Sequence, residues 1–199
     1  MINMTMKTTA KALFISSALA ITTMASAALP TQWELDDSHT RVGFSVSHMG
    51  FSTTMGHFSD VEGVVNYDMK APNQTSMEFT IATDSIDTNW DARDKHLKTD
   101  EFFNVEKYPT MTFKSTQVKF INPQQAKVTG DFTLLGQTKP LTLDVTLNKI
   151  DNSPLTKEPV AGFRATGTID RAAYGMTAYA SGITTNVPIQ IDGELVEKK

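Results

Sequence analysis

The alternation of apolar and polar residues constrains the fold of this chain more than any other feature. Residues 141–147 are the clearest case, because Leu141, Leu143, Val145 and Leu147 alternate with Thr and Asp. A period of two is typical of a strand that buries one face and exposes the other. The same pattern recurs in six further segments, at residues 42–46, 77–81, 111–113, 118–120, 128–134 and 187–191.

Turn-forming residues separate these segments. Pro72-Asn73, Asn122-Pro123, Gly136-Gln137 and residues 152–154 interrupt the alternation. Many short amphipathic strands in series predict an all-β antiparallel barrel or sandwich. A closed barrel of about eight strands is wide enough either for a filled core or for one bound ligand, and the alternation favours neither.

One segment departs from the strand pattern. Residues 89–98 read NWDARDKHLK, with Thr88 or Asn89 available as a helix N-cap. Arg93, His96 and Leu97 then share one helical face, because they are spaced by three and four residues. A second turn is expected at residues 99–103. We therefore predict a short helical insert around residues 89–104.

The first 27 residues have the three parts of a cleavable export signal. Lys7 and Lys11 supply the positive start, residues 12–23 are apolar, and Ala25-Ser26-Ala27 is a small-residue cleavage site. The apolar run of about 12 residues is shorter than the ~20 that span a bilayer. The sequence thus predicts cleavage after Ala27, a single domain at residues 28–199, and a periplasmic protein without stable membrane insertion.

Charge and cysteine content exclude several classes of function. Of 18 Lys and Arg residues, cleavage removes Lys7 and Lys11, which leaves 16 against 22 Asp and Glu, a net charge of −6. An acidic domain is poorly suited to nucleic acid, so no nucleic-acid partner is expected. The chain has no cysteine, so its stability depends on the core rather than on disulfides.

The sequence offers little support for catalysis. None of the four histidines (His39, His48, His57 and His96) stands in a tight metal-ligand motif, and no metal or cofactor is expected. Ser38 and His39 lie beside Asp36, but adjacent strand residues point to opposite faces, so we do not expect them to meet. An enzyme that uses His39 or His96 as a base is an alternative without a known reaction. An outer-membrane barrel is disfavoured, because the alternate strand face is polar.

Several long motifs in order carry a resemblance to a known family. The strings include WELDDSHTRVGFSV at 33–46, RDKHL at 93–97 and DRAAYGM at 170–176. On these motifs, and those at residues 85–88, 102–103, 108–113 and 130–141, the chain resembles the YceI family of exported bacterial proteins. Thr40 and Ala172 replace serines that are common in the family.

The resemblance implies a lipocalin-like, eight-stranded antiparallel barrel that carries or stores a polyisoprenoid-type lipid, such as a quinone or its precursor. A general carrier of fatty acids or amides, or a stress-related protein, is the alternative. Arg93 and His96 become candidates for a polar head group, and whether the chain forms a homodimer stays open. The expected ligand-binding residues are Phe44, Val46, His48, Phe79, Ile81, Arg93, His96, Leu97, Phe113, Phe132, Leu134, Leu143 and Val145.

Overall fold

Ten strands make up most of the computed structural model, which describes residues 31–67 and 71–198. The predicted signal peptide, residues 1–27, lies outside the described residues. The strands are β1 (Thr31–His48), β2 (Ser52–Phe58), β3 (Val61–Tyr67), β4 (Ser76–Ala82), β5 (Ile86–Asp87), β6 (Thr110–Asn122), β7 (Gln125–Leu134), β8 (Gln137–Asn152), β9 (Pro159–Asp170) and β10 (Asn186–Glu197).

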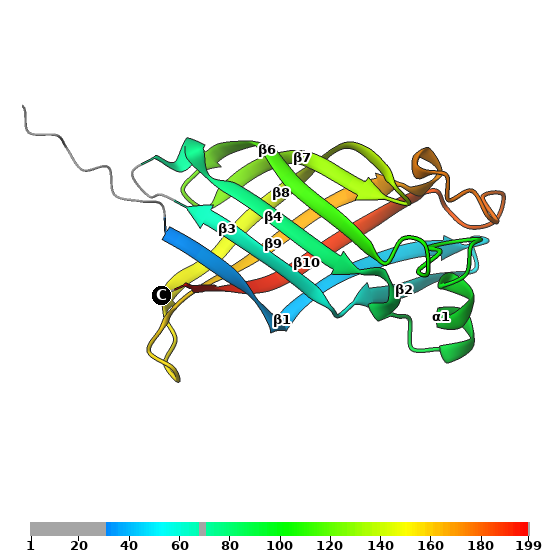
Figure 1. The fold of residues 1–199 in the computed structure, drawn as a ribbon, viewed down its shortest axis with the longest axis horizontal. Coiled ribbons are helices and arrows are strands. Elements are labelled where there is room, and N and C mark those ends of the chain that lie inside the picture. Colours follow the sequence, from blue (N-terminus) through cyan, green and yellow to red (C-terminus); the bar gives the residue numbers. More distant parts are fainter. Residues whose placement is uncertain (1–30, 68–70, 199) are drawn as a thin grey trace, which may run out of the picture.

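Eight of these strands form a closed antiparallel barrel. The order runs β10-β9-β8-β7-β6-β4-β3-β1, and β10 also pairs with β1, which closes the ring (Figure 1). Every pairing is antiparallel. The eight-stranded barrel expected from the sequence is thus confirmed.

The remaining two strands lengthen the barrel at one end. The first part of β1 pairs with β3, while Val42–His48 of the same strand pairs with β2. Short β5 then pairs with β2. In Figure 1 this extension lies at the end that carries α1, opposite the C-terminus. The barrel therefore has two different ends.

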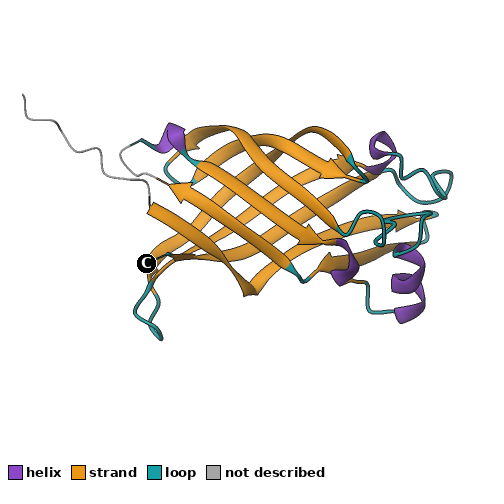
Figure 2. Cartoon of the chain, viewed as in Figure 1, coloured by secondary structure: helices purple, strands orange, loops and turns teal. Residues whose placement is uncertain are grey.

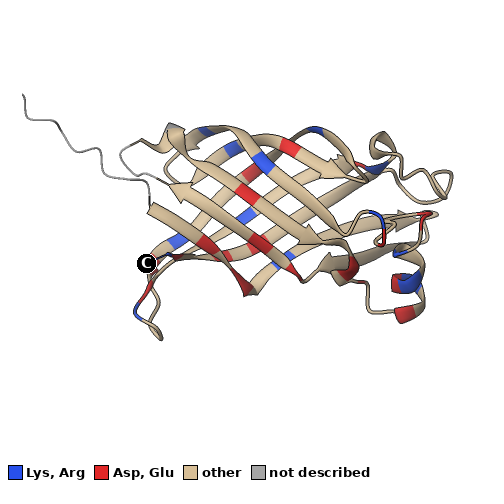
Figure 3. Cartoon of the chain, in the orientation of Figure 1, with Lys and Arg blue, Asp and Glu red and all other residues tan. Residues whose placement is uncertain are grey.

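Alternation sets the inside and the outside of the wall. In β7 every second residue from Ala126 to Leu134 is buried, and the residues that alternate with them are more exposed. Lys, Arg, Asp and Glu are scattered over the strands with both signs interspersed (Figure 3). The predicted segments at 111–113 and 118–120 belong to one strand, β6. An irregularity between Ser115 and Gln117 moves the inward side from odd to even positions.

The helical insert is confirmed as α1 (Asp91–Leu97), followed by turns up to residue 107. Its N-cap, however, is Trp90, which makes no capping bond through its side chain. Our choice of Thr88 or Asn89 as N-cap is therefore wrong. Asp94 instead reaches back and accepts hydrogen bonds from the N–H and hydroxyl of Thr88. This carboxylate ties the first turn of α1 to the segment before it, and its negative charge is favourable near a helix N-terminus.

Three 3-10 helices complete the described chain: η1 (Pro72–Gln74), η2 (Thr83–Ser85) and η3 (Arg171–Tyr174). Figure 2 shows η3 at the same end as α1, with η1 at the other end. Within residues 31–67 and 71–198, no helix is long and apolar enough to cross a bilayer.

Candidate ligand-binding cavity

Phenylalanine rings lie against glycines in the barrel wall, and this arrangement keeps the interior open. An added Cβ on Gly63 would lie 2.0 Å from Cδ1 of Phe79, its cross-strand neighbour. A Cβ on Gly56 would lie 2.5 Å from Cζ of Phe44, which faces it across β1 and β2. Because glycine has no side chain, each ring can rest on the neighbouring strand instead of filling the lumen.

The first of two cavities occupies the barrel itself, and we call it the barrel chamber. It measures about 210 Å³. Its described lining contains no Lys, Arg, His, Asp or Glu. Two polar atoms of lining residues, Nε1 of Trp33 and Oγ1 of Thr75, are buried without a hydrogen-bond partner in the described part of the chain. The barrel chamber is thus a narrow, uncharged slot.

The second cavity lies under α1 and the segment that follows η3, and we call it the helix chamber. Its volume is about 580 Å³, inside the ~300–1,000 Å³ of typical small-molecule sites. Trp90, Arg93 and His96 line it from one side, and Met176, Tyr179 and Ile183 from the other. Exposed Met49, Trp90 and Tyr179 are among its lining residues, so this chamber reaches the surface.

The two chambers adjoin, because four residues line both: Met111, Phe132, Ile169 and Ile189. We call these four residues the neck. They come from β6, β7, β9 and β10, so the neck is built by the barrel wall. The side chains of these four residues are thus the boundary between the two chambers.

All thirteen residues expected to bind a ligand line one of the chambers. Whether they contact a ligand stays a prediction. The helix chamber contains Phe44, Val46, His48, Arg93, His96, Leu97 and Leu134; the barrel chamber contains Phe79, Ile81, Phe113, Leu143 and Val145; Phe132 lies at the neck.

Arg171 was missed by the sequence analysis. This residue holds residues 176–184, which we call the cover of the helix chamber, in place. Its side chain is 5% exposed and donates to the carbonyl oxygens of Thr184, Met176, Ala178 and Ile183 at 2.7–3.1 Å. Burial lowers the pKa of Arg171, and the charge of Asp170 opposes this shift. No sequence signal could have revealed this role, because all four acceptors are backbone atoms.

Arg93 is held at the chamber wall with donors to spare. Its Nε donates to Oγ1 of Thr88 at 2.7 Å, and Nη2 donates to the Thr88 carbonyl at 2.6 Å. The guanidinium lies 5.4 Å from the centroid of the Trp90 ring. A guanidinium has five N–H donors, so the side chain is oriented while Nη1 remains available to an acceptor in the chamber.

His96 is oriented from both sides. Its Nε2 lies 2.5 Å from Oε2 of Glu101. The ring meets Phe102 and Tyr179 edge-on, with centroids 5.2 and 5.9 Å away. Glu101 therefore already takes one ring nitrogen, and only Nδ1 is left for a ligand.

The helix chamber is lined by basic side chains and by no acidic ones among the described residues. The basic residues are Arg93, Arg171, His48 and His96. Two permanent guanidinium charges in a partly enclosed space favour an occupant that accepts hydrogen bonds or carries negative charge. An ammonium head group would be repelled.

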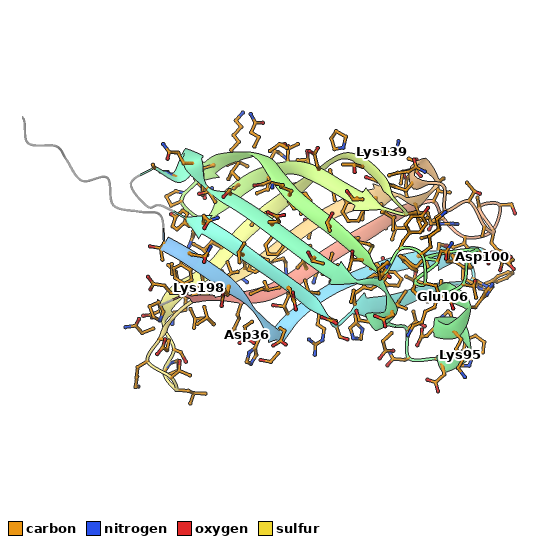
Figure 4. The ribbon with its side chains drawn as sticks, in the orientation of Figure 1. Asp36, Lys95, Asp100, Glu106, Lys139 and Lys198 are labelled. Atoms are coloured by element: carbon orange, nitrogen blue, oxygen red, sulfur yellow. The ribbon has the colours of Figure 1, made fainter. Side chains whose placement is uncertain are left out.

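The bend of β1 corrects our expectation that Ser38 and His39 do not meet. Pairing with β10 is irregular between Asp36 and Arg41, so the side chains there no longer alternate. Figure 4 labels Asp36 at this bend. Ser38 Oγ donates to Oδ1 of Asp36 at 2.6 Å, and Nδ1 of His39 lies 2.8 Å from Oδ2 of Asp36 and 3.0 Å from Ser38 Oγ.

This contact does not make a nucleophile. A catalytic serine needs one ring nitrogen of histidine for itself and the other for the carboxylate. Here Asp36 and Ser38 share Nδ1 of His39, and the serine proton is directed to Asp36. None of the three residues lines either chamber. The group fixes the bend of the strand.

Asp36, His39 and Glu194 are the described residues whose ligand atoms converge best for a metal ion, within 4.8 Å of one another. Their site is on the outer wall. Hydrogen bonds from Ser38 and His39 lower the pKa of Asp36, and the hydrogen bond to Asp36, followed by the charges of Asp36 and Glu194, raises the pKa of His39. The carboxylate of Asp36 thus already has His39 as its partner.

Comparison with known proteins gives a consistent result. The family model of the YceI-like domain matches residues 33–195. A UPF0312 protein of Pectobacterium carotovorum is 36% identical over 95% of this chain and 98% of its own length. Protein YceI of Salmonella arizonae is also 36% identical, over 94% of this chain and 96% of its own length.

Solved structures share the fold. Campylobacter jejuni YCEI protein superposes with a TM-score of 0.69 at 27% identity, covering 76% of this chain and 90% of its own. Burkholderia cenocepacia BcnA gives 0.72 at 22% identity, over 80% and 98%. A polyisoprenoid binding domain from Saccharophagus degradans gives 0.60 at 16% identity, over 86% and 100%. Since the family model covers most of the chain and close relatives match nearly end to end, this protein belongs to the YceI family.

Proposed function

We propose that this protein binds a linear lipid of the polyisoprenoid type, with the chain in the barrel chamber and the head in the helix chamber. One observation carries the proposal: a smaller chamber without charged lining residues adjoins a larger one whose lining includes Arg and His but no Asp or Glu among the described residues. A long apolar chain with an acceptor-bearing head, such as a quinone or a pyrophosphate, is complementary to this division.

Burial of the chain supplies the affinity. Each buried CH₂ group contributes roughly 0.8 kcal/mol. Association costs on the order of 4–15 kcal/mol, so a few isoprene units in the chambers offset it. Nη1 of Arg93 then fixes the orientation by donating to the head, and Nδ1 of His96 is the second polar group beside it. Binding of this kind involves no catalytic step and no cofactor besides the lipid.

The proposed role is to carry or store the lipid in the periplasm. The predicted signal peptide supports that location, and a water-filled space between two membranes is where an insoluble chain needs a carrier. The name of the Saccharophagus domain, which binds polyisoprenoids, supports the lipid class through a shared fold. The mass of the exported protein tests the location, because cleavage after Ala27 predicts an N-terminus at Ala28.

Organic extraction of the purified protein, followed by mass spectrometry, tests the function. We expect an isoprenoid lipid to copurify with protein produced in bacteria, at close to one molecule per chain. Protein that is empty and takes up no added isoprenoid would contradict the proposal. The Ile189→Trp variant, in which a bulky ring blocks the neck, is the matched control. Lipid extracted from it in equal amount would be lipid that adheres to the surface.

A broader carrier of fatty acids or amides is the second candidate. The free donor of Arg93 would also suit a carboxylate, and the barrel chamber admits an unbranched chain. Competition between an isoprenoid and a fatty acid of equal chain length separates the two candidates. Preference for the isoprenoid supports a dedicated role, and equal affinity supports the general carrier.

A further inference from the structure

The β1–β2 hairpin and the loop after η3 meet at the outer end of the helix chamber. The N–H of Met49 donates to the carbonyl of Gly182 at 2.7 Å, and His48 forms a β-bridge with Ile183. Figure 1 shows both segments at the far end of the barrel, beside α1. We call residues 48–52 together with residues 177–184 the uncharged tip.

The tip carries no formal charge over a long stretch of sequence. No Lys, Arg, Asp or Glu occurs between Arg41 and Asp60, or between Arg171 and Asp192. Figure 3 shows these segments without the blue and red that mark the rest of the barrel. By contrast, α1 and its following turn are charged, and Figure 4 labels Lys95, Asp100 and Glu106 there.

Large apolar side chains are exposed on this tip. Phe51 is 88% exposed, and Met49 and Tyr179 are more than half exposed. Trp90 at the start of α1 and Met55 on β2 are exposed close by. Five of the eight exposed large apolar residues in the described chain thus gather at this end, which marks an interaction surface.

The hairpin that presents these side chains is a tight turn. Phe51 N–H donates to the carbonyl of His48 at 3.0 Å, and both central residues, Met49 and Gly50, have positive φ, at 53° and 76°. Positive φ at both central residues of a β-turn is the signature of type I′, here within the three-residue loop 49–51. The apolar side chains are therefore held outward by the backbone.

The exposed surface continues into the cavity. Met49, Trp90 and Tyr179 are exposed and also line the helix chamber. An occupant that covers the tip and also reaches into the helix chamber needs an apolar surface together with flexible chains, and a lipid phase supplies both. We propose that the uncharged tip docks on the surface of a lipid bilayer, so that the cargo passes between membrane and chamber without crossing water.

The absence of charge defines the kind of membrane contact. Apolar and aromatic side chains insert at the level of the head groups, where Trp and Tyr are favoured. Without Lys or Arg, the tip gains nothing from anionic lipids. Docking should therefore occur on neutral phosphatidylcholine vesicles, change little with salt, and not improve when phosphatidylglycerol is added.

Vesicle flotation of matched variants tests the proposal. Phe51→Glu adds one charge to the tip, and Leu155→Glu adds one at a site 90% exposed in the β8–β9 loop at the other end. Neither residue lines a chamber. We expect Phe51→Glu to reduce the vesicle-bound fraction and the rate of cargo transfer from vesicles roughly tenfold, because a charge opposes insertion. Leu155→Glu should match the unmodified protein.

The inference uses the proposed function only for the nature of the cargo, and the two can fail separately. Docking is measured on vesicles without cargo, and cargo binding is measured with lipid delivered from detergent, where Phe51→Glu should bind normally. In a Trp33→Phe background, Trp90 is the sole tryptophan, and vesicle lipids brominated in their acyl chains should quench it.

Three results would overturn docking. The first is that Phe51→Glu and Leu155→Glu float with vesicles to the same extent. The second is that the protein binds vesicles but Trp90 is not quenched. The third is that Phe51→Glu loses self-association while its vesicle-bound fraction does not change. The last result would assign the tip to a second copy of this chain.

Discussion

The two chambers of this barrel share part of its wall but are built by different means. The barrel chamber is walled by side chains of alternating strands, and its lining contains no ionisable Lys, Arg, His, Asp or Glu. The helix chamber is closed by a helix and a loop that are tied down by hydrogen bonds, through Arg93 to Thr88 and through Arg171 to four carbonyls. Alternation alone thus makes a slot for a chain, and a site for a head needs irregular segments.

The neck offers the strongest test of this division. Ile189→Trp places a bulky ring where the chambers join and should exclude the chain from the barrel chamber. If four CH₂ groups lose their burial, the affinity for a long-chain lipid falls by about 3 kcal/mol, or roughly 200-fold. Calorimetric titration with lipids of increasing chain length measures this loss of affinity.

Ile189→Val is the matched control and should bind normally. Short-chain ligands with the same head should bind the two variants equally. A thermal unfolding curve shows whether Ile189→Trp still folds. Unchanged long-chain affinity in a folded Ile189→Trp variant would remove the barrel chamber from the binding site.

Arg171 tests whether the cover is a separate element. Arg171→Lys keeps the charge but cannot reach four carbonyls at once, so we expect the free energy of unfolding to fall by about 2 kcal/mol. Hydrogen exchange should increase at residues 175–186 and stay unchanged in β7. Arg164→Lys, which changes an exposed pair with Asp192, should cost less than ~0.5 kcal/mol. Equal losses would show that Arg171 has no special role.

Head recognition is expected to contribute less than chain burial. Replacing Arg93 and His96 together with alanine should weaken binding of an acceptor-headed isoprenoid about tenfold, near 1.4 kcal/mol, because the donor of Arg93 and the polar ring beside it are lost. A hydrocarbon of the same length should bind unchanged. Lys95→Ala on the same helix serves as the control. If the double variant binds both ligands like the unmodified protein, these residues do not contact the head.

The smallest effect concerns the bend of β1, which lies outside both chambers. Asp36→Asn should move the pKa of His39 down toward the ordinary 6.5, while Asp37→Asn should leave it raised. Titration of the His39 ring protons by NMR measures both. Cargo affinity should not change in either variant, and a change would link the bend to the cavity.

The direction of these pKa shifts also sets a pH window. The raised pKa of His39 stabilises the fold below pH 6.5, and that contribution is lost as the pH rises through the folded pKa. The lowered pKa of Asp36 contributes above pH 3.8 and is lost as the pH falls through the folded value. The pair therefore stabilises most between these two ordinary values.

Much of the barrel could be predicted because its strands alternate strongly. Strands β3 and β9 were missed, and the reason lies in the cavity. Inward positions of β9 include Ala161 and Ala165, which line the barrel chamber, and an added Cβ on Gly167 would lie 2.7 Å from Leu143. A wall that leaves room for a ligand uses small residues, and small residues weaken the alternating signal.

The site was predictable where side chains repeat with the strand period and not elsewhere. Residues such as Phe79 and Leu143 could be assigned to the interior from parity and resemblance. Arg171 could not, because its partners are carbonyl oxygens brought together by a loop. The contact of Ser38 with His39 was also unpredictable, since it depends on an irregularity that cancels alternation at that point.

Where the two ends of a bound lipid lie is the central claim, and the two tryptophans measure it directly. Trp33 lines the barrel chamber and Trp90 lines the helix chamber, and they are the only tryptophans in the chain. A lipid brominated at the tail end should quench Trp33 in a Trp90→Phe variant and leave Trp90 bright in a Trp33→Phe variant. Quenching of Trp90 alone, or equal quenching of both, would contradict the division into a chain chamber and a head chamber.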